Sequence, residues 1–263
     1  MTGRPWNAII LAASRSADDR MAKAHGIANK CAIEVGGIPM LARVAQTLQN
    51  SETVATTLIS IENRSVATAI LGEKAATITS APSAPASVIA ALDQKALSYP
   101  VLITTADHAL LAPAMVQYFC QSAEQSAGDF VVGLATAETV LSAYPKTVRT
   151  FFRLGKARLS GCNLFALRNE RGLKLLARWQ YLESVRKKPW RLVAAFGIMP
   201  LFRFLTGTLD LEGALAVVSR TLGLQVTAVF MPFPEAAIDI DKPADKELAE
   251  EILSKRSALH YRP

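Results

Sequence analysis

The sequence predicts an α/β fold with three layers, in which helices cover both faces of a doubly wound, mostly parallel sheet. Two short apolar runs, residues 8–12 and 101–103, are typical of central parallel strands buried on both faces. Strand-like and helix-like runs alternate along the chain, as they do in α/β proteins. The 263 residues, 51% of them hydrophobic, are enough to build one large core. We therefore expect a single domain over residues 1–263.

The segment after the first strand is suited to bind an anion. Ala13, Ser14 and Ser16 offer backbone N–H groups that no bulky side chain shields. Four cationic residues belong to the same loop: Arg15, Arg20, Lys23 and Lys30. Arg presents a planar fork to phosphate oxygens and Lys a mobile point charge, so the loop fits a triphosphate. A basic surface loop is the alternative that charge alone allows.

Glycine, proline and capping residues predict the elements that follow. The turn at residues 36–39 contains two glycines and a proline and opens a helix over 40–48. A strand over 56–61 and a helix over 65–71 come next. A loop of small residues, 80–87, then leads into a helix over 88–97, which Ser87 is placed to cap.

The second strong signal is a buried strand at residues 100–106 that delivers a carboxylate, Asp107, at its carboxyl end. Ligands of open α/β sheets bind outside the carboxyl ends of the strands, so Asp107 and the loop after Ala12 should share one crevice. The alternative for Asp107 is a cap for a helix that starts near Ala112. His108 is expected to be a loop residue at the substrate side without a catalytic role.

A small β-hairpin and helical insertion is expected after a strand over 130–134. Residues 147–156 read as a strand and turn, and the Ser160–Asn163 cluster supplies hydroxyl and amide groups suited to fix a polar substrate head. The alternative is a β-bulge in which Asn163 bonds its own backbone. Residues 184–209 join a cationic cluster to an apolar run, which resembles an interfacial membrane segment, a buried helix or a homodimer face.

The last strand-like run, residues 225–231, is followed by two more carboxylates, Asp239 and Asp241. Strand alternation would place both on one face. One of them could then serve the crevice of Asp107, for which Asp239 is preferred, while the other caps a helix that begins at Pro243.

Composition excludes several classes of protein. The net charge of +7 would suit nucleic acid, but zinc-finger spacing, basic heptads and aromatic RNA-binding strands are all missing from the sequence. Because the sequence contains neither an apolar run of about 18 residues nor a signal-peptide pattern, we expect a cytoplasmic protein. A peripheral position on the inner face of the membrane, through residues 184–209, stays open. Cys31, Cys120 and Cys162 are scattered and expected to be reduced.

Several motifs together resemble the nucleotidyltransferases, in particular the molybdenum-cofactor guanylyl- and cytidylyltransferase branch. That family opens with a strand and L-A-x-G-x-G-x-x-R-M, a Lys several residues on, and G-G-x-P-[ML]-[LI]. The counterparts here are Leu11-Ala12-Ala13, Arg20-Met21, Lys30 and Gly36-Gly37-Ile38-Pro39-Met40-Leu41. Ser14 and Ser16 replace the usual glycines. The segment around Asp239 resembles the closing D-[IV]-[DN]-T-P-E-D-L motif, with Lys242 and Ala244 in place of Thr and Glu.

The resemblance implies an Mg²⁺-dependent transfer of a nucleoside monophosphate, most simply CMP or GMP, from an NTP to a small phosphorylated acceptor. Arg20 and Lys30 would stabilise the triphosphate, with Lys23 as an alternative lysine. The other nucleotide-binding residues would be Leu11, Ala12, Ala13, Ser14, Arg15 and Ser16, with Ser83 and Ser87 toward the base. Asp107, Asp239 and Asp241 would hold Mg²⁺, for which Mn²⁺ can substitute. Ser160, Asn163 and Arg149 or Arg153 would contact the acceptor.

On this reading residues 1–135 bind the NTP, 136–235 bind the acceptor, and 236–263 close the metal site. Three alternatives stay open. One is a nucleotide-binding relative without catalysis, and another is a glycosyltransferase of the same architecture, although Asp107 is not followed by the expected second Asp. The third is a cytidylyltransferase at the membrane surface that makes an activated lipid headgroup.

Overall fold

Apolar strands form the centre of the molecule, as the computed structural model shows for residues 5–14, 20–185 and 197–260. Six strands of the main sheet form two parallel groups, β10-β7 and β6-β1-β4-β5. The long strand β9 (Ala157–Leu167) lies between β6 and β7 and is antiparallel to both. The other strands of this sheet are β1 (Trp6–Leu11), β4 (Val54–Ile61), β5 (Thr77–Thr79), β6 (Val101–Thr105), β7 (Phe130–Thr136), β8 (Phe152–Leu154) and β10 (Val226–Phe230).

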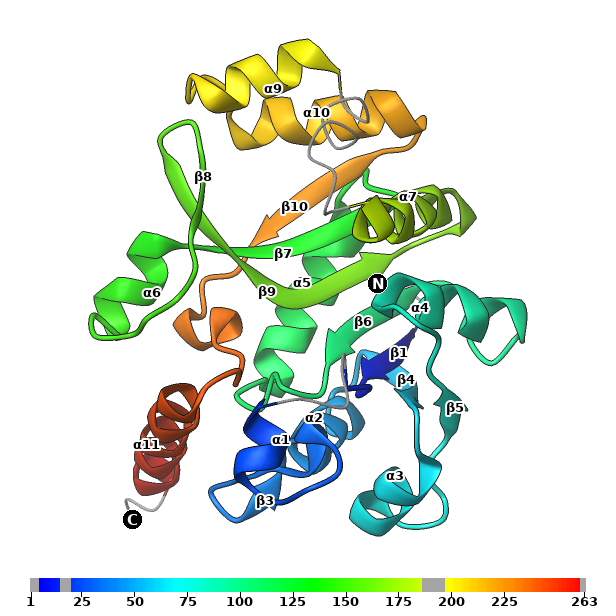
Figure 1. The fold of residues 1–263 in the computed structure, drawn as a ribbon, viewed down its shortest axis with the longest axis vertical. Coiled ribbons are helices and arrows are strands. Elements are labelled where there is room, and N and C mark those ends of the chain that lie inside the picture. The colour runs from blue at the N-terminus through cyan, green and yellow to red at the C-terminus, as the bar shows by residue number, and fades with distance from the viewer. Residues whose placement is uncertain (1–4, 15–19, 186–196, 261–263) are drawn as a thin grey trace.

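Helices cover both faces of this sheet, so the predicted three-layer fold is confirmed (Figure 1). One core cluster packs α2, α3, α5 and α6 against one face, and another packs α4, α7 and α10 against the other. Side chains alternate between the two: Ala8 and Ile10 belong to the first cluster and Ile9 to the second. These helices are α2 (Met40–Gln49), α3 (Arg64–Leu71), α4 (Ala84–Asp93), α5 (Pro113–Gln125), α6 (Ala137–Ala143), α7 (Leu173–Val185) and α10 (Leu211–Leu222).

A third core cluster attaches the C-terminal helix α11 (Pro243–His260) to the N-terminal half. Ile238 and Ile240 are fully buried in it, together with Ile252 of α11 and Val35 of the small hairpin. The elements on the N-terminal side are α1 (Arg20–Ala24), the 3₁₀ turn η1 (Lys30–Ala32), β2 (Glu34–Val35) and β3 (Ile38–Pro39). The remaining elements are η2 (Glu170–Gly172), α9 (Ile198–Leu205) and η3 (Pro234–Ala237).

The structure corrects several predicted boundaries. Helix α4 begins at Ala84 rather than at residue 88, because Ser83 accepts a hydrogen bond from the Ala86 N–H and caps it. Ser87 is therefore not the cap. The strand expected from residue 147 is limited to β8, and β9 is a central strand of the sheet rather than part of a peripheral insertion.

The three cysteines are free and buried, in agreement with the reduced state expected. No helix within the described ranges is long and apolar enough to cross a membrane.

Candidate active site

The site forms where the carboxyl ends of the neighbouring parallel strands β1 and β6 meet. Leu11 and Thr105 end these strands in register, and the Ala106 N–H donates to the Leu11 carbonyl at 3.0 Å. Asp107 and the loop after Ala12 therefore lie at the same edge of the sheet, as predicted. Asp107 does not cap the following helix, since α5 begins at Pro113 with Ala112 as its N-cap residue.

Two neighbours fix the Asp107 carboxylate. The Thr105 hydroxyl donates to Oδ1 at 2.5 Å, and the Lys30 ammonium donates to Oδ2 at 3.0 Å. Burial alone would raise the pKa of Asp107, but the charge of Lys30 and the Thr105 hydrogen bond outweigh it and lower that pKa. Asp107 is therefore a pre-ionised and firmly oriented carboxylate.

Lys30 bridges two carboxylates. Its Nζ also lies 2.5 Å from Asp241 Oδ1, and its side chain is only 15% exposed. Burial lowers the pKa of Lys30, yet the two carboxylates outweigh burial and raise it, so the ammonium stays charged. Lys23 is an exposed residue of α1, so the structure places Lys30 and not Lys23 on Asp107.

Asn29 places Lys30. It caps η1 by accepting from the Cys31 N–H, while its amide donates to the Ala12 carbonyl at 3.1 Å and to Glu62 Oε1 at 2.8 Å. This buried residue therefore connects the lysine to the end of β1. Asn29, Thr105 and Glu62 were not predicted as site residues from the sequence. Strand adjacency could have pointed to Glu62, because it follows β4, the other neighbour of β1.

The loop that the sequence predicts to bind the nucleotide is described only in part. Ala12 is buried and Ala13 is exposed, while the Ser14 N–H donates to both oxygens of Glu62 at 3.3 Å. Arg15 and Ser16 lie outside the described residues, as does the side chain of Arg20, which begins α1. Ser14 thus offers one N–H to a carboxylate, which is an anion in the position where a phosphate was expected.

Asp239 is the second half-buried carboxylate of the site. Arg149 pairs with its Oδ1 and also donates to its backbone carbonyl at 3.0 Å, and Asn163 Nδ2 donates to Oδ2 at 2.9 Å. Burial raises the pKa of Asp239; Arg149 lowers it, while the charges of Asp107 and Asp241 raise it further. The net shift is upward. The charges of the other two carboxylates thus act on Asp239.

The segment that carries Asp239 and Asp241 is extended without being a strand. Buried Ile238 and Ile240 alternate with the two aspartates, and the Ile240 N–H donates to the Asp107 carbonyl at 3.1 Å. The predicted alternation is confirmed, but the predicted cap is wrong. Asp245, not Asp241, accepts from the backbone N–H groups of Asp241 and Lys242 at 3.1 and 2.9 Å.

Asn163 owes its position to a bulge in β9. Pairing with β7 shifts register between Val132 and Leu134, and Asn163 has a φ of +48°. The bulge that was held as an alternative is present, yet the amide reaches Asp239 rather than its own backbone. The predicted acceptor residues Arg149 and Asn163 therefore come together.

Ser160 and Arg153 do not join that pair. Ser160 is buried at 5% exposure opposite Ala135 of β7, and Arg153 donates from Nε to the Gly155 carbonyl within the hairpin turn. At the opposite end of the site, the hydroxyl of Ser87 is used within its own loop, donating to the Ser83 carbonyl and accepting from the Ala81 N–H.

His108 is fully buried and so does not face the substrate side, which corrects the expectation from the sequence. Burial lowers the pKa of His108 to about 4, so the ring is neutral at physiological pH. Its ring nitrogens have no hydrogen bond of ordinary geometry to any residue that the structure describes. This environment does not favour a catalytic base.

The donor set fits a hard divalent cation. Asp107 and Asp239 supply carboxylate oxygens, the ligands that Mg²⁺ prefers, and Mg²⁺ sites need only one or two carboxylates when phosphates and water complete the shell. Burial raises the pKa of Asp239 and the charges of Asp107 and Asp241 raise it further, and a bound cation would relieve this repulsion. Among the described residues, no group of three or more acidic, His or Cys side chains is already arranged around a metal position.

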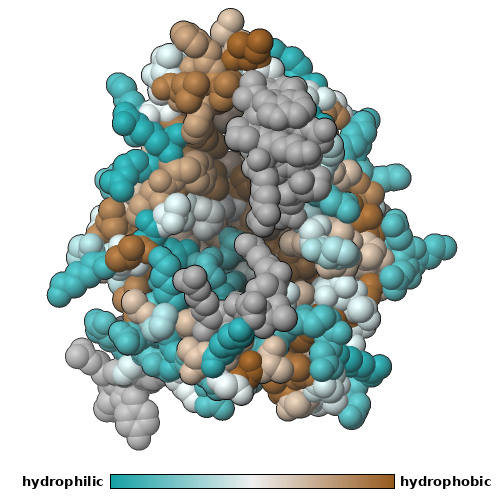
Figure 2. Space-filling model, in the orientation of Figure 1, coloured by the Kyte–Doolittle hydropathy of each residue, from teal (hydrophilic) through white to brown (hydrophobic). Residues whose placement is uncertain are grey.

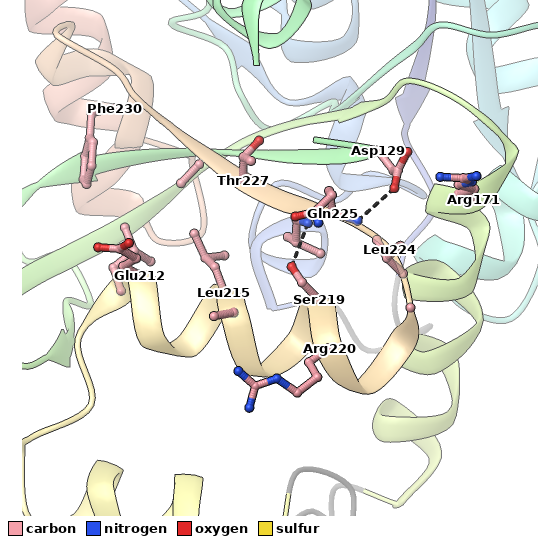
Figure 3. A pocket seen from close by; sticks show the side chains of 15 residues that line it. Asp129, Arg171, Glu212, Leu215, Ser219, Arg220, Leu224, Gln225, Thr227 and Phe230 are labelled. Carbon is pink, nitrogen blue, oxygen red and sulfur yellow. Dashed lines mark hydrogen bonds between the residues drawn. The ribbon is translucent and has the colours of Figure 1, made fainter. Parts of the chain in front are cut away.

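A cavity of about 720 Å³ lies elsewhere, between α10 and β10 (Figure 3). Its polar groups bond one another: Asp129 accepts from the Gln225 N–H, and Ser219 accepts from the Val226 N–H. None of the predicted site residues is among the described residues that line it. The cavity is therefore not the place where Asp107 and Lys30 would meet a ligand.

Comparisons with known proteins agree with this geometry. A hypothetical transferase from Thermus thermophilus has a TM-score of 0.78 and 26% identity, over 92% of this chain and 99% of that one. Two further structures share the fold. CMP:2-keto-3-deoxy-manno-octonic acid synthetase complexed with CTP has a TM-score of 0.60 and 14% identity, over 97% of this chain and 100% of its own. 4-Diphosphocytidyl-2C-methyl-D-erythritol synthase from Anaerococcus prevotii has a TM-score of 0.59 and 12% identity, over 95% and 99%.

No curated protein sequence matches the chain significantly. Residues 8–188 match the sequence model of the MobA-like NTP transferase domain, and this segment includes both Lys30 and Asp107. The match covers more than half of the chain and agrees with the fold. The chain thus belongs to the MobA-like NTP transferase family and is a nucleotidyltransferase.

Proposed function

We propose that this enzyme transfers a nucleoside monophosphate from CTP or GTP to a small phosphorylated acceptor and releases pyrophosphate, with Mg²⁺ as its metal ion. One observation carries the proposal: Lys30 and the carboxylates Asp107, Asp239 and Asp241 converge at the carboxyl ends of β1 and β6. A charged lysine beside carboxylates suits phosphoryl-group transfer, because catalysis of this reaction consists largely of positioning the phosphate groups and stabilising their charge.

The reaction needs no protein base when the nucleophile is already a phosphate oxygen. That oxygen attacks the α-phosphorus of the NTP, the bond from this phosphorus to the bridging oxygen breaks, and pyrophosphate leaves with the electron pair. Lys30 stays protonated and would stabilise the negative charge on the triphosphate. Arg20 and the backbone of the loop from Leu11 to Ser16 would hold the same group.

We assign the metal to Asp107 and Asp239. When bound, Mg²⁺ would neutralise charge on the α-phosphate and on the leaving pyrophosphate. Asp107 offers an oriented, ionised carboxylate, while Arg149 and Asn163 hold Asp239 in place. Arg149 and Asn163 also form the acceptor-side wall of the proposed site. Asp241 acts through Lys30, whose ammonium it contacts.

The support for CTP as the donor comes from the names of structural neighbours. The names of two proteins that share the fold refer to CMP and diphosphocytidyl compounds. Since they are 12% and 14% identical to this chain, they support testing CTP first and leave GTP as the second candidate.

The experiment measures pyrophosphate release with CTP, GTP, ATP and UTP in turn, with Mg²⁺ and pooled phosphorylated acceptors. We expect one nucleotide to give release that Lys30→Met lowers at least about 100-fold, because a buried transition-state cation is lost. Lys74→Met, an exposed lysine beyond α3, is the matched control and should keep the full rate. Absence of release and of any nucleotide-dependent rise in thermal stability would overturn the proposal.

A further inference from the structure

Helix α9 is unusual because it is apolar and almost wholly exposed. Seven of its eight residues are apolar, and none of the eight is buried. Ile198, Met199, Phe202 and Leu205 are 80%, 68%, 61% and 72% exposed. Their spacing of one, four and seven residues from Ile198 places them on one side of the helix. Figure 2 shows apolar side chains gathered at the top of the molecule, where Figure 1 places α9.

The apolar face of α9 gains little from burial against the described part of the fold. Short helices in water depend on the packing of an apolar face, and eight residues are too few for propensity alone. At the end of α9, the Arg203 carbonyl accepts from the N–H groups of Thr208 and Leu209, and the Arg203 side chain lies near Gly213 of α10. Within the part of the chain that the structure describes, the four apolar side chains of this face are therefore left largely uncovered.

The charge of the surrounding region indicates what that partner is. Residues 149–225 contain 14 Lys and Arg against 4 Asp and Glu, whereas the rest of the chain contains 15 against 18. The whole positive charge of the protein therefore comes from the part of the sequence that contains α9. A concentration of positive charge on one segment is typical of binding to an anionic surface.

Exposed cations lie close to α9 in space as well. The hairpin between β8 and β9 approaches the connection that follows the helix, since a Cβ on Gly155 would lie 3.4 Å from Asp210. Arg153 and Lys156 of this hairpin line one groove together with Gly207 and Thr208. Both cations are exposed, so basic side chains lie beside the connection that follows α9.

We propose that the apolar face of α9 binds peripherally to an anionic lipid bilayer. The helix lies in the plane of the interface, with Ile198, Met199, Phe202 and Leu205 at the boundary between headgroups and acyl chains. The exposed cations Arg153 and Lys156 of the neighbouring hairpin face the lipid phosphates. Apolar area and charge attraction add in this mode of binding, so a short helix suffices where the surrounding surface is cationic.

A second copy of this chain is a weaker candidate for the same face. A symmetric dimer through α9 would bring two strongly positive regions together, and like charges across an interface oppose association. A stable protein interface also buries about 800 Å² on each partner, which is much for a helix of eight residues. An anionic bilayer has neither difficulty.

The test is flotation of the full-length protein with vesicles of phosphatidylcholine, with and without phosphatidylserine. We expect binding to the anionic vesicles only, reduced at least about tenfold when salt is raised from about 0.1 to 1 M, because the Debye length falls from about 10 to 3 Å. Phe202→Glu and Leu205→Glu should each lower partitioning at least about tenfold.

The matched control is Ala69→Glu, which adds the same charge to an exposed position of α3, far from α9 in Figure 1. It should bind like the wild type. All three variants should keep the wild-type rate of pyrophosphate release in the absence of vesicles. Equal binding to neutral vesicles, no binding at all, or a dimer in sedimentation that Phe202→Glu separates would each overturn the proposal.

Discussion

Asp107 and Asp239 are two half-buried carboxylates of one site, yet their surroundings shift their pKa values in opposite directions. Each pairs with a cation and a neutral donor: Lys30 and Thr105 for Asp107, Arg149 and Asn163 for Asp239. The partners are alike, so they do not explain the difference. Asp239 additionally experiences the charges of Asp107 and Asp241, and this repulsion comes on top of its burial.

The two carboxylates of the site therefore differ in their electrostatic surroundings before any ligand binds. Asp107 has a lowered pKa and is held by Lys30 and Thr105 of the N-terminal half of the chain. Asp239 is the carboxylate whose charge is least well compensated, and it would gain most from a cation. The proposed metal should therefore depend on both residues, but for different reasons: on Asp107 for orientation and on Asp239 for charge.

The variant Asp107→Asn should have the largest effect on the site. It removes the oriented carboxylate and leaves Lys30 with Asp241 as its carboxylate partner, so we expect the rate of pyrophosphate release to fall about 1000-fold. Steady-state kinetics over a range of Mg²⁺ concentrations measures the effect, and a retained cooperative thermal transition controls for folding. A variant with more than a third of the wild-type rate would remove Asp107 from the metal site.

Asp239→Asn should have the next largest effect, about 100-fold on the same rate. The amide keeps an oxygen for the cation but loses the charge, and Arg149 then lacks its ion pair. We expect the Mg²⁺ concentration for half-maximal rate to rise more than it does for Thr105→Val, the variant that alters the surroundings of Asp107 and keeps its carboxylate. An unchanged Mg²⁺ requirement would speak against Asp239 as a ligand.

Asn163→Gly isolates the amide that orients Asp239. Glycine accepts the positive φ without strain but lacks the hydrogen bond, and loss of such supporting contacts at metal sites typically costs about tenfold or more in activity. Asn163→Ala should lose the same activity and be less stable, because a Cβ disfavours this φ. Parallel kinetics and thermal unfolding separate the two effects. Equal activity of Asn163→Gly and the wild type would assign Asn163 to backbone geometry alone.

The smallest effect concerns stability against pH, measured by urea unfolding without metal or nucleotide. The lowered pKa of Asp107 contributes stability that is present above its ordinary value of 3.8 and is lost as the pH falls through the native value. The raised pKa of Asp239 acts in the opposite sense: stability is lost as the pH rises from 3.8 through its native value. The difference in the free energy of unfolding between the wild type and Asp107→Asn should therefore increase as the pH rises. The corresponding difference between the wild type and Asp239→Asn should decrease. If both differences in unfolding free energy changed with pH in the same direction, the inferred difference between Asp107 and Asp239 would be contradicted.

The sequence predicted the positions of these residues better than their partners. Asp107 could be predicted because it ends an apolar strand next to the first one, and the alternation of Ile238 and Ile240 predicted the common face of Asp239 and Asp241. Lys30 came from the resemblance to a family. Its contacts with Asp107 and Asp241 depend on three distant segments, which no local pattern encodes.

The failures have local physical reasons. Two serines compete for the cap of α4, and Pro85 close behind Ser83 favours the earlier start, a signal that was present and overlooked. The central place of β9 could not be predicted, because pairing with both β6 and β7 is decided by long-range packing. The bulge that turns Asn163 toward Asp239 depends on the same pairing.

The contact of Asp245 with the backbone of Asp241 and Lys242 has a consequence for the biosynthesis of this enzyme. Every strand of the main sheet lies before residue 231, and the family match ends at residue 188. Asp239 and helix α11, whose Asp245 holds the segment of Asp239 in place, come later in the chain than both. A nascent chain can therefore complete its sheet while still lacking Asp239. We expect catalytic competence to arise last, because a chain that ends after β10 lacks Asp239 and Asp241 and, on the function proposed above, does not consume nucleoside triphosphate.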